Sequence, residues 1–155
     1  MLTPSPSPSA PPPAAALSGG ACLLLDYQEI NSALGTQFDV AAAASKSGTY
    51  TCVIQGGDAY PDLTLSITST TLTATDFKAD VQPSGSKPVS SLGKVGYSSL
   101  SKASSGTGPG IEIGWLSGND RLIVMRYTAA VGATVPSSLT SGMVTLARKV
   151  DATTV

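Results

Sequence analysis

Residues 111–127 read IEIGWLSGNDRLIVMRY, two short apolar segments around the polar sequence Ser-Gly-Asn-Asp. Apolar segments on either side of such a turn are a strong local signal for a β-hairpin. We therefore expect strands at 111–116 and 122–127. The second strand is apolar at positions on both faces, so each face needs cover from the rest of the chain or from a partner. The hairpin predicts a sheet at the centre of the fold.

Three more strands are expected before this hairpin. Residues 50–54 are rich in β-branched and aromatic types, and residues 63–68 alternate between apolar and hydroxyl side chains. Between them, residues 56–62 have the glycine, aspartate and proline content of a hairpin loop. A further strand is expected from about residue 92 to 101. Residues 36–47 show no clear period, so we expect a loop or a weak edge strand there.

Three segments have the apolar spacing and the capping residues of helices. The first, at 27–34, begins with an Asp-x-x-Glu sequence and is stopped by Gly35. The second, at 74–81, ends at Pro-Ser-Gly, and the third, at 137–150, carries a continuous apolar stripe. The expected order is α-β-β-α-β-β-β-α. We predict a single α+β domain over residues 22–155, with a mostly antiparallel sheet of about five strands packed with three helices.

Residues 1–20 differ in composition from the rest of the chain. They contain six of the eleven prolines and no charged residue, so we expect a disordered Pro/Ser-rich stalk or linker. No basic segment followed by an apolar one is present, so we recognise no signal peptide. We interpret Met1 as a start that replaces a secretion signal and a lipidated cysteine, and an ordinary disordered tail is the alternative.

Cys22 and Cys52 are the only cysteines, and the chain has no histidine. Two thiols are too few for a zinc site. We favour a disulfide between them, and two buried reduced thiols are the alternative. Closing this loop would stabilise the fold by about 3.5 kcal/mol, and the bridge would imply an oxidising, extracytoplasmic compartment.

The composition excludes several classes of function. Charged residues make up 12% of the chain and the net charge is −1, so nothing favours nucleic acid or an anionic membrane surface as a partner. The absence of histidine excludes Ser-His-Asp and Cys-His nucleophiles and histidine metal sites. Serine (22) and threonine (17) carry much of the polarity, which is typical of a secreted β-rich protein. We expect no cofactor and no enzymatic activity.

Three motifs stand out in this order of elements. They are CLLL leading to EI and ALG within 22–35, YTC at 50–52, and SLGKVGY at 91–97. Together they resemble a family of actinobacterial cell-envelope lipoproteins of unknown function. The resemblance implies an antiparallel sheet packed with helices, similar to PsbP-like domains, on a secreted, lipid-anchored protein. It also implies a disulfide between a cysteine before the first helix and one in the first strand. Ser91 and Lys94 depart from the family pattern, and no catalytic residue transfers.

Few residues have the spacing of a ligand site. Asp58 and Asp62 are weak candidates for Ca²⁺ ligands, with Asn119 or Asp120 as a further oxygen donor. Turns use the same residue types without any metal, and this is the favoured interpretation. The loop at 103–110 resembles a phosphate loop only in its glycines, because a strand and not a helix follows it.

The predicted hairpin carries the remaining candidates. Glu112 and Asp120 are the carboxylates of the hairpin, but nothing in the sequence brings them into one pocket for acid and base chemistry. Trp115 and Tyr127 lie on facing strands, where core packing is favoured and an exposed ligand platform is the alternative. Arg126 is expected to extend to solvent or to pair with Glu112 across the hairpin. A ligand or partner surface would involve Tyr60, Trp115 and Arg126.

The leading functional expectation is a non-catalytic extracytoplasmic domain that binds a protein or polymer partner in the cell envelope. Such a protein would be held at the cell surface by a lipid anchor outside this sequence and would not bind nucleic acid. The first alternative is a carrier of a small apolar ligand or lipid in a cavity between the sheet and the last helix. The second is a carboxylate-based hydrolase, which needs two carboxylates in one cleft.

Replacing residues 1–20 by a Gly/Ser linker of equal length is predicted to change the free energy of unfolding by less than about 0.5 kcal/mol. A segment without charge or apolar periodicity buries too little surface to offset its ordering entropy. Chemical denaturation followed by circular dichroism measures the difference. A larger loss would show that the segment docks on the domain.

Overall fold

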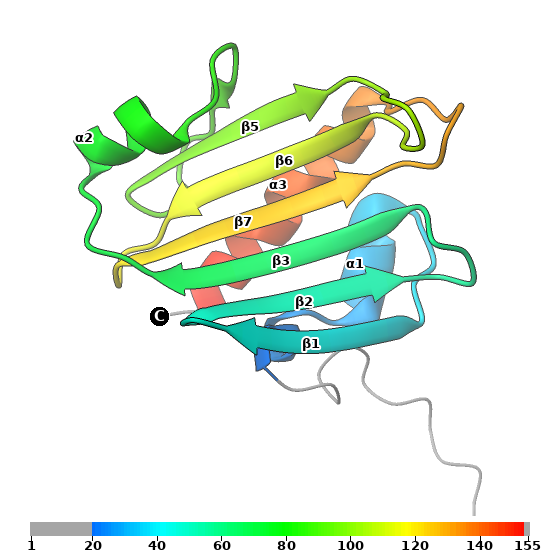
Figure 1. Ribbon diagram of the computed structural model, residues 1–155, viewed down its shortest axis with the longest axis horizontal. Coiled ribbons are helices and arrows are strands. Elements are labelled where there is room, and N and C mark those ends of the chain that lie inside the picture. Colours follow the sequence, from blue (N-terminus) through cyan, green and yellow to red (C-terminus); the bar gives the residue numbers. More distant parts are fainter. Residues whose placement is uncertain (1–19, 154–155) are drawn as a thin grey trace, which may run out of the picture.

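The fold is built on one seven-stranded antiparallel sheet, shown in Figure 1. The structure, a computed structural model, describes residues 20–153, so the predicted stalk lies outside the described residues except for Gly20. The elements are, in chain order, the 3₁₀-helix η2 (Gly20–Leu24), α1 (Tyr27–Leu34), β1 (Val40–Lys46), β2 (Thr49–Gln55), β3 (Asp62–Ser69), α2 (Ala74–Asp76), the π-helix η3 (Phe77–Val81), β4 (Lys87–Pro88), β5 (Val95–Ser101), β6 (Gly110–Leu116), β7 (Arg121–Thr128) and α3 (Ser137–Thr153).

The strands lie in the order β1-β2-β3-β7-β6-β5-β4. The predicted α+β class and the antiparallel pairing are confirmed, and the five predicted strands form as β2, β3, β5, β6 and β7. The expected count of about five strands is too low, because β1 and β4 extend the two edges of the sheet. β1 lies in the segment 36–47, where an edge strand was one of two alternatives. β4 has only two residues, too few to show an alternating pattern.

Helices α1 and α3 cover one face of the sheet, behind it in Figure 1. Asp26 caps α1 by accepting a hydrogen bond from the backbone N–H of Gln28 at 2.9 Å. Gly35 ends the same helix with a left-handed φ of 67°, as predicted. α3 begins where predicted and continues past residue 150. Its apolar stripe is buried in the main core against the sheet: Leu139, Met143, Leu146, Ala147 and Val150.

Part of the opposite face is covered by α2 and η3. The helix predicted at 74–81 consists of one capped α-turn followed by a π-helical turn. Phe77 of η3 packs with Tyr97 and Leu116 in a small second core, and Leu122 of β7 lies against it. Both faces of β7 are therefore covered within the chain near Leu122, as its apolar sequence requires.

A disulfide between Cys22 and Cys52 ties η2 to β2, with a Cα–Cα distance of 5.0 Å. Both cysteines are fully buried in the main core. The predicted pairing is confirmed, and such a bridge indicates an oxidising, extracytoplasmic environment. Within residues 20–153, no helix combines the length and the hydrophobicity that a membrane crossing requires.

Replacing both Cys22 and Cys52 by alanine is predicted to lower the free energy of unfolding by about 2–4 kcal/mol. The reason is that the denatured chain regains the entropy of an open loop between the two positions. Urea denaturation of the oxidised protein and of the double variant measures the loss. A difference below about 1 kcal/mol would contradict a stabilising role for the bridge.

Candidate functional site

The sheet face opposite α1 and α3 is rich in hydroxyl groups. On β3, alternate residues are buried against the helices, so Thr64, Ser66 and Thr68 point to this open face. Thr49 and Thr51 of β2 pair with Thr68 and Ser66, and the hydroxyls of Thr49 and Thr68 lie 2.9 Å apart. This face is turned toward the viewer in Figure 1. It offers a surface of hydroxyl groups rather than an apolar one.

A hollow of about 410 Å³ lies on this face, over β5, β6 and β7. Its volume is within the range of ligand and peptide sites. Its lining combines an aromatic ring, two cations, one carboxylate and several serine and threonine hydroxyls, among them Tyr60, Lys102, Arg126, Glu112 and Thr128. We refer to it below as the Arg126 hollow.

Arg126 and Glu112 form an ion pair at the floor of this hollow. The register of β6 and β7 places the two residues side by side. The Nε of Arg126 donates to Oε2 of Glu112 at 3.0 Å, and Nη2 contacts the same oxygen. The other oxygen, Oε1, accepts a hydrogen bond from the Tyr97 hydroxyl at 2.6 Å. The ion pair expected across the hairpin is therefore present, and both carboxylate oxygens are engaged.

The two partners of this ion pair differ in exposure. The side chain of Arg126 is 57% exposed, whereas that of Glu112 is 19% exposed. Glu112 is therefore a held anchor, and Arg126 presents its guanidinium to solvent. An exposed arginine that an ion pair holds on one side is suited to donate hydrogen bonds to a bound molecule. Its side chain is already ordered by Glu112, so less conformational entropy is lost on binding.

Burial and neighbouring charges alter two acidities at this site. Burial raises the pKa of Asp62, and a hydrogen bond with Thr128 and the charge of Arg126 oppose that rise. Burial also raises the pKa of Tyr97, and the hydrogen bond to Glu112 and its negative charge raise it further, against the opposing charge of Arg126. Tyr97 therefore stays a neutral hydrogen-bond donor to the carboxylate at physiological pH.

Two of the three residues predicted for a partner surface line the Arg126 hollow, namely Tyr60 and Arg126. The third, Trp115, has no surface role, because its side chain is 0% exposed, and the core packing that the sequence favours for it is confirmed. Trp115 lies on the helix-covered face of β6, and its Nε1 donates to Asp151 of α3 at 3.0 Å. Along a strand, residues 112 and 115 point to opposite faces, so Trp115 cannot join Glu112 and Arg126.

The structure does not bring the proposed calcium ligands together. Asp62 pairs with Thr128 at one end of the β3–β7 ladder, whereas Asn119 and Asp120 lie in the turn at its other end. Eight strand residues separate these ends by roughly 24 Å. Within residues 20–153, no three acidic or cysteine side chains gather at metal-binding distance.

The carboxylates considered for acid and base chemistry are also apart. Glu112 lies in the Arg126 hollow, whereas Asp120 lies in the β6–β7 turn and pairs with Lys94. Each carboxylate is thus bound to its own cation. The sequence does not predict the roles of Tyr97 and Lys102, because they depend on the register of β5 beside β6 and on the loop that follows β5.

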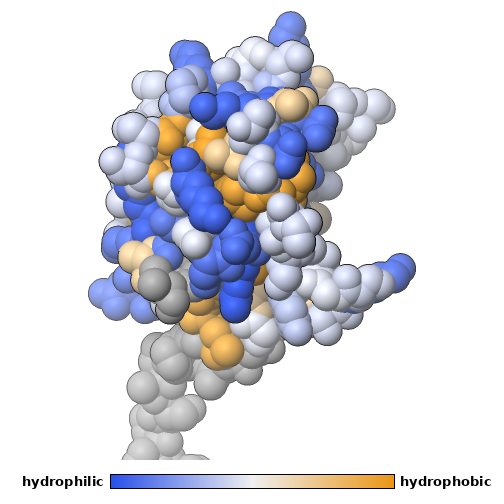
Figure 2. All heavy atoms as spheres, turned by 90° about the vertical axis from the view of Figure 1, so that its left-hand side faces the viewer, coloured by the Kyte–Doolittle hydropathy of each residue, from blue (hydrophilic) through white to orange (hydrophobic). Residues whose placement is uncertain are grey.

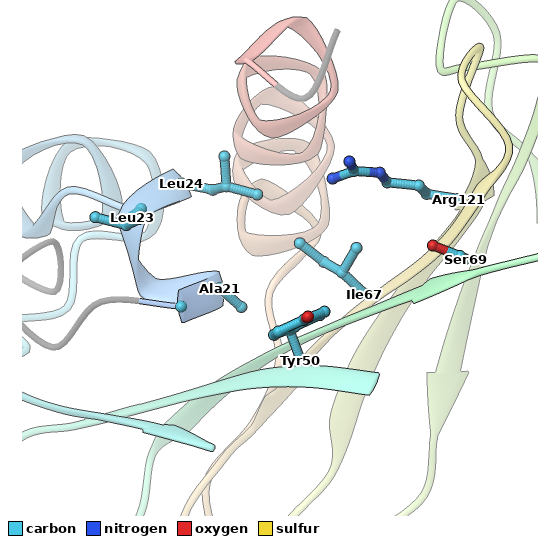
Figure 3. Close-up of a pocket in the computed structure, with 8 residues that line it drawn as sticks. Ala21, Leu23, Leu24, Tyr50, Ile67, Ser69 and Arg121 are labelled. Carbon is cyan, nitrogen blue, oxygen red and sulfur yellow. The ribbon is translucent and has the colours of Figure 1, made fainter. Parts of the chain in front are cut away.

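A second, more apolar hollow of about 440 Å³ lies at one end of the sheet, beside η2. In Figure 3, Leu24 and Arg121 lie on opposite sides of it, and Tyr50 and Ile67 project into the space between them. Figure 2 views this end of the molecule and shows hydrophobic residues gathered in its middle, with hydrophilic residues around them. We refer to it below as the end hollow.

Comparison of the chain with models of protein families, with curated proteins and with solved structures finds no match.

Tyr97 is predicted to ionise well above pH 10, the ordinary value for tyrosine. Because its pKa is raised in the folded state, its contribution to stability is complete below pH 10 and is lost as pH rises through the folded pKa. Ultraviolet titration of tyrosine ionisation in the wild type and in Tyr97→Phe measures this. The variant should lack a late ionisation that the wild type shows.

Tyr27→Phe is the matched control for this titration. The pKa of Tyr27 is also raised, by burial and by the charge of Asp39, but this residue lies in α1, on the other face of the sheet from Glu112. Its replacement is expected to leave the late ionisation of Tyr97 in place. If Tyr97→Phe removed an ionisation near pH 10 instead of a late one, the buried hydrogen bond to Glu112 would be refuted.

Proposed function

We propose that this protein is a non-catalytic extracytoplasmic domain of a surface-anchored lipoprotein, and that it binds a protein or polymer partner of the cell envelope. The disulfide supports the extracytoplasmic location. The lipoprotein class and a PsbP-like fold rest on the motifs at 22–35, 50–52 and 91–97, and the α+β element order is consistent with them. The partner is expected to bind on the open face of the sheet.

The observation that carries the binding role is the exposed guanidinium of Arg126 in its hollow. Glu112 engages two of its three nitrogens, so the N–H groups of Nη1 remain for a bound molecule. Tyr60 and Lys102, which also line the hollow, add an aromatic ring and a second cation. Arginine and tyrosine are the residue types that dominate binding energy at protein surfaces.

The chemistry of the hollow favours acceptor oxygens on the partner. Arginine and lysine only donate hydrogen bonds, and the hydroxyls of the open face donate or accept them. Peptide carbonyls, carboxylates and sugar hydroxyls meet these demands. A protein segment or a polysaccharide therefore fits better than an apolar ligand at this place.

Two features support a non-catalytic role. The chain has no histidine to act as a general base near neutral pH. In the Arg126 hollow, both oxygens of Glu112 accept hydrogen bonds from Tyr97 and Arg126, and no second carboxylate among the described residues lines the hollow to complete an acid–base pair. A carboxylate-based hydrolase is therefore the least supported of the three candidate classes.

The end hollow favours a second candidate function, a carrier of a small apolar ligand or lipid. Leucine, isoleucine and tyrosine side chains line it, and the exposed Arg121 at its rim suits a polar or anionic end of such a ligand. The space between the sheet and α3, where this ligand was expected, is occupied by Met143, Leu146 and Val150, all buried. The place for an apolar ligand is thus the end of the sheet.

Binding of the partner is predicted to weaken when the Arg126 hollow is altered. The immobilised protein is exposed to envelope extract separated into protein, polysaccharide and lipid fractions. The double variant Glu112→Gln/Arg126→Gln removes both charges together, so that no buried carboxylate is left unpaired. This variant and Tyr60→Ala are each expected to bind the retained fraction at least about tenfold more weakly than the wild type.

Lys87→Gln is the matched control, because Lys87 is an exposed cation on β4 outside the Arg126 hollow. It is expected to bind like the wild type. Equal binding by all four proteins would contradict the proposed site. Retention of only the lipid fraction, unchanged by the Arg126 and Tyr60 variants, would support the carrier function at the end hollow instead.

A further inference from the structure

The end hollow has one apolar wall and one polar wall. The apolar wall is η2, which contributes Ala21, Leu23 and Leu24. The polar wall is the end of the β3–β7 ladder, where Ser69 pairs with Arg121. In Figure 3 the side chain of Arg121 extends from its strand toward the side on which Leu24 lies. A molecule in this hollow therefore meets polar groups at one end and apolar groups at the other.

The surface between the two walls is apolar. Ile67 of β3 forms its floor and is 5% exposed, whereas Tyr50 and Leu23 at the rim are 51% and 63% exposed. All three side chains lie on the helix-covered side of the sheet or in η2 itself. Exposed apolar side chains over a buried apolar floor lose contact with water when an apolar chain lies across them, and this burial favours binding.

The positive charge of the hollow is not balanced from within. Among the described residues, no acidic side chain lines it. The ion pairs within residues 20–153 are made by Lys94, Arg126 and Lys149, so the guanidinium of Arg121 has no carboxylate partner there. A carboxylate is the group that matches a guanidinium best, because its two oxygens accept two parallel N–H bonds. The hydroxyl of Ser69 on the neighbouring strand supplies a further donor.

The size of the hollow limits the apolar part of the ligand. Its volume of about 440 Å³ lies toward the lower end of the roughly 300–1,000 Å³ of small-molecule sites. Such a space suits one acyl chain rather than the two chains of a membrane phospholipid. The ligand is therefore a single-chain molecule with an anionic end.

The disulfide holds the apolar wall in place. Cys22 stands between Ala21 and Leu23 in η2, and its bond to Cys52 fixes this short helix against β2. A five-residue 3₁₀-helix is too short to keep its position by its own hydrogen bonds. The bridge thus prepares the hollow before a ligand enters, which reduces the ordering cost of binding.

We propose that the end hollow binds a fatty acid, an unbranched acyl chain that ends in a carboxylate. The carboxylate accepts hydrogen bonds from Arg121 and Ser69, and the chain crosses Ile67 toward η2. This inference rests on the carrier role of the end hollow, the second candidate function, and names the ligand class of that site. The Arg126 hollow lies on the other face of the sheet, so the two sites are separate.

Isothermal titration of the full chain with octanoate, decanoate and dodecanoate, each below its micelle concentration, tests the proposal. Each added methylene that the hollow covers is expected to tighten binding by about fourfold. 1-Decanol has the same chain as decanoate and no charge, and its binding is expected to be about tenfold weaker than that of decanoate. A chain that binds without regard to its length would contradict an apolar site.

Two variants separate the two ends of the ligand. Arg121→Gln is expected to bind decanoate about tenfold more weakly and to bind 1-decanol like the wild type. The backbone groups of Arg121, and not its guanidinium, make the hydrogen bonds to Ser117 in the turn, so the fold is retained. Leu23→Gln is expected to weaken the binding of both molecules. Circular dichroism and thermal melts verify the fold of each variant.

Lys87→Gln and Leu100→Gln are the matched controls, an exposed cation and an exposed leucine outside the end hollow. Both are expected to bind decanoate like the wild type. A weakening by Lys87→Gln equal to that by Arg121→Gln would show unspecific charge attraction and would overturn the proposal.

The remaining outcomes distinguish this inference from the functions proposed above. Equal binding of decanoate by the wild type and Arg121→Gln would overturn the carboxylate site, and binding of 1-decanol that depends on Leu23 would then leave the carrier function standing. Binding of neither molecule would overturn both the fatty-acid site and the carrier function. It would not affect the partner site in the Arg126 hollow, which is tested with its own variants.

Discussion

The pairing of β3 with β7 is the interaction on which the rest of the structure depends. It runs over eight residue pairs, from Asp62↔Thr128 to Ser69↔Arg121, and it joins parts of the chain that are far apart in sequence. Without it, β1 to β3 and β4 to β7 would be two small separate sheets. No turn connects the two strands, so their association depends on the apolar side chains that it buries, such as Leu65 beside Met125.

The register of this pairing also builds the candidate site. Because side chains alternate along a strand, the register of β3 and β7 that buries Leu65 and Met125 on one face places Thr64 and Arg126 on the other face. A slip by one residue would turn Arg126 into the core and an apolar side chain into solvent. The requirement to bury one face thus fixes the polar residues of the other, and the stability of the core and the geometry of the Arg126 hollow have one cause.

The sheet is covered unevenly, and its uncovered parts are the places where function is proposed. Helices α1 and α3 close one face, whereas α2 and η3 cover only the part of the other face around Phe77. This leaves the hydroxyl-rich surface with the Arg126 hollow and the end hollow beside η2. Each has a different chemistry, so each is suited to a different kind of contact.

Alternation, turn residues and caps in the sequence determined five strands, the helix positions and the Arg126–Glu112 pair, because these depend on neighbours within a strand, a helix or one hairpin. The same alternation places Trp115 and Arg126 on opposite faces of the sheet. Only the tertiary structure decided that the alanine-rich segment at 40–46 is a strand, since small side chains carry no clear period and β2 supplies the missing order. It alone also decided the approach of Tyr97 to Glu112 and the distance between Asp62 and Asp120. These depend on which strands become neighbours, and that choice is made by the burial of side chains from the whole chain rather than by any local pattern.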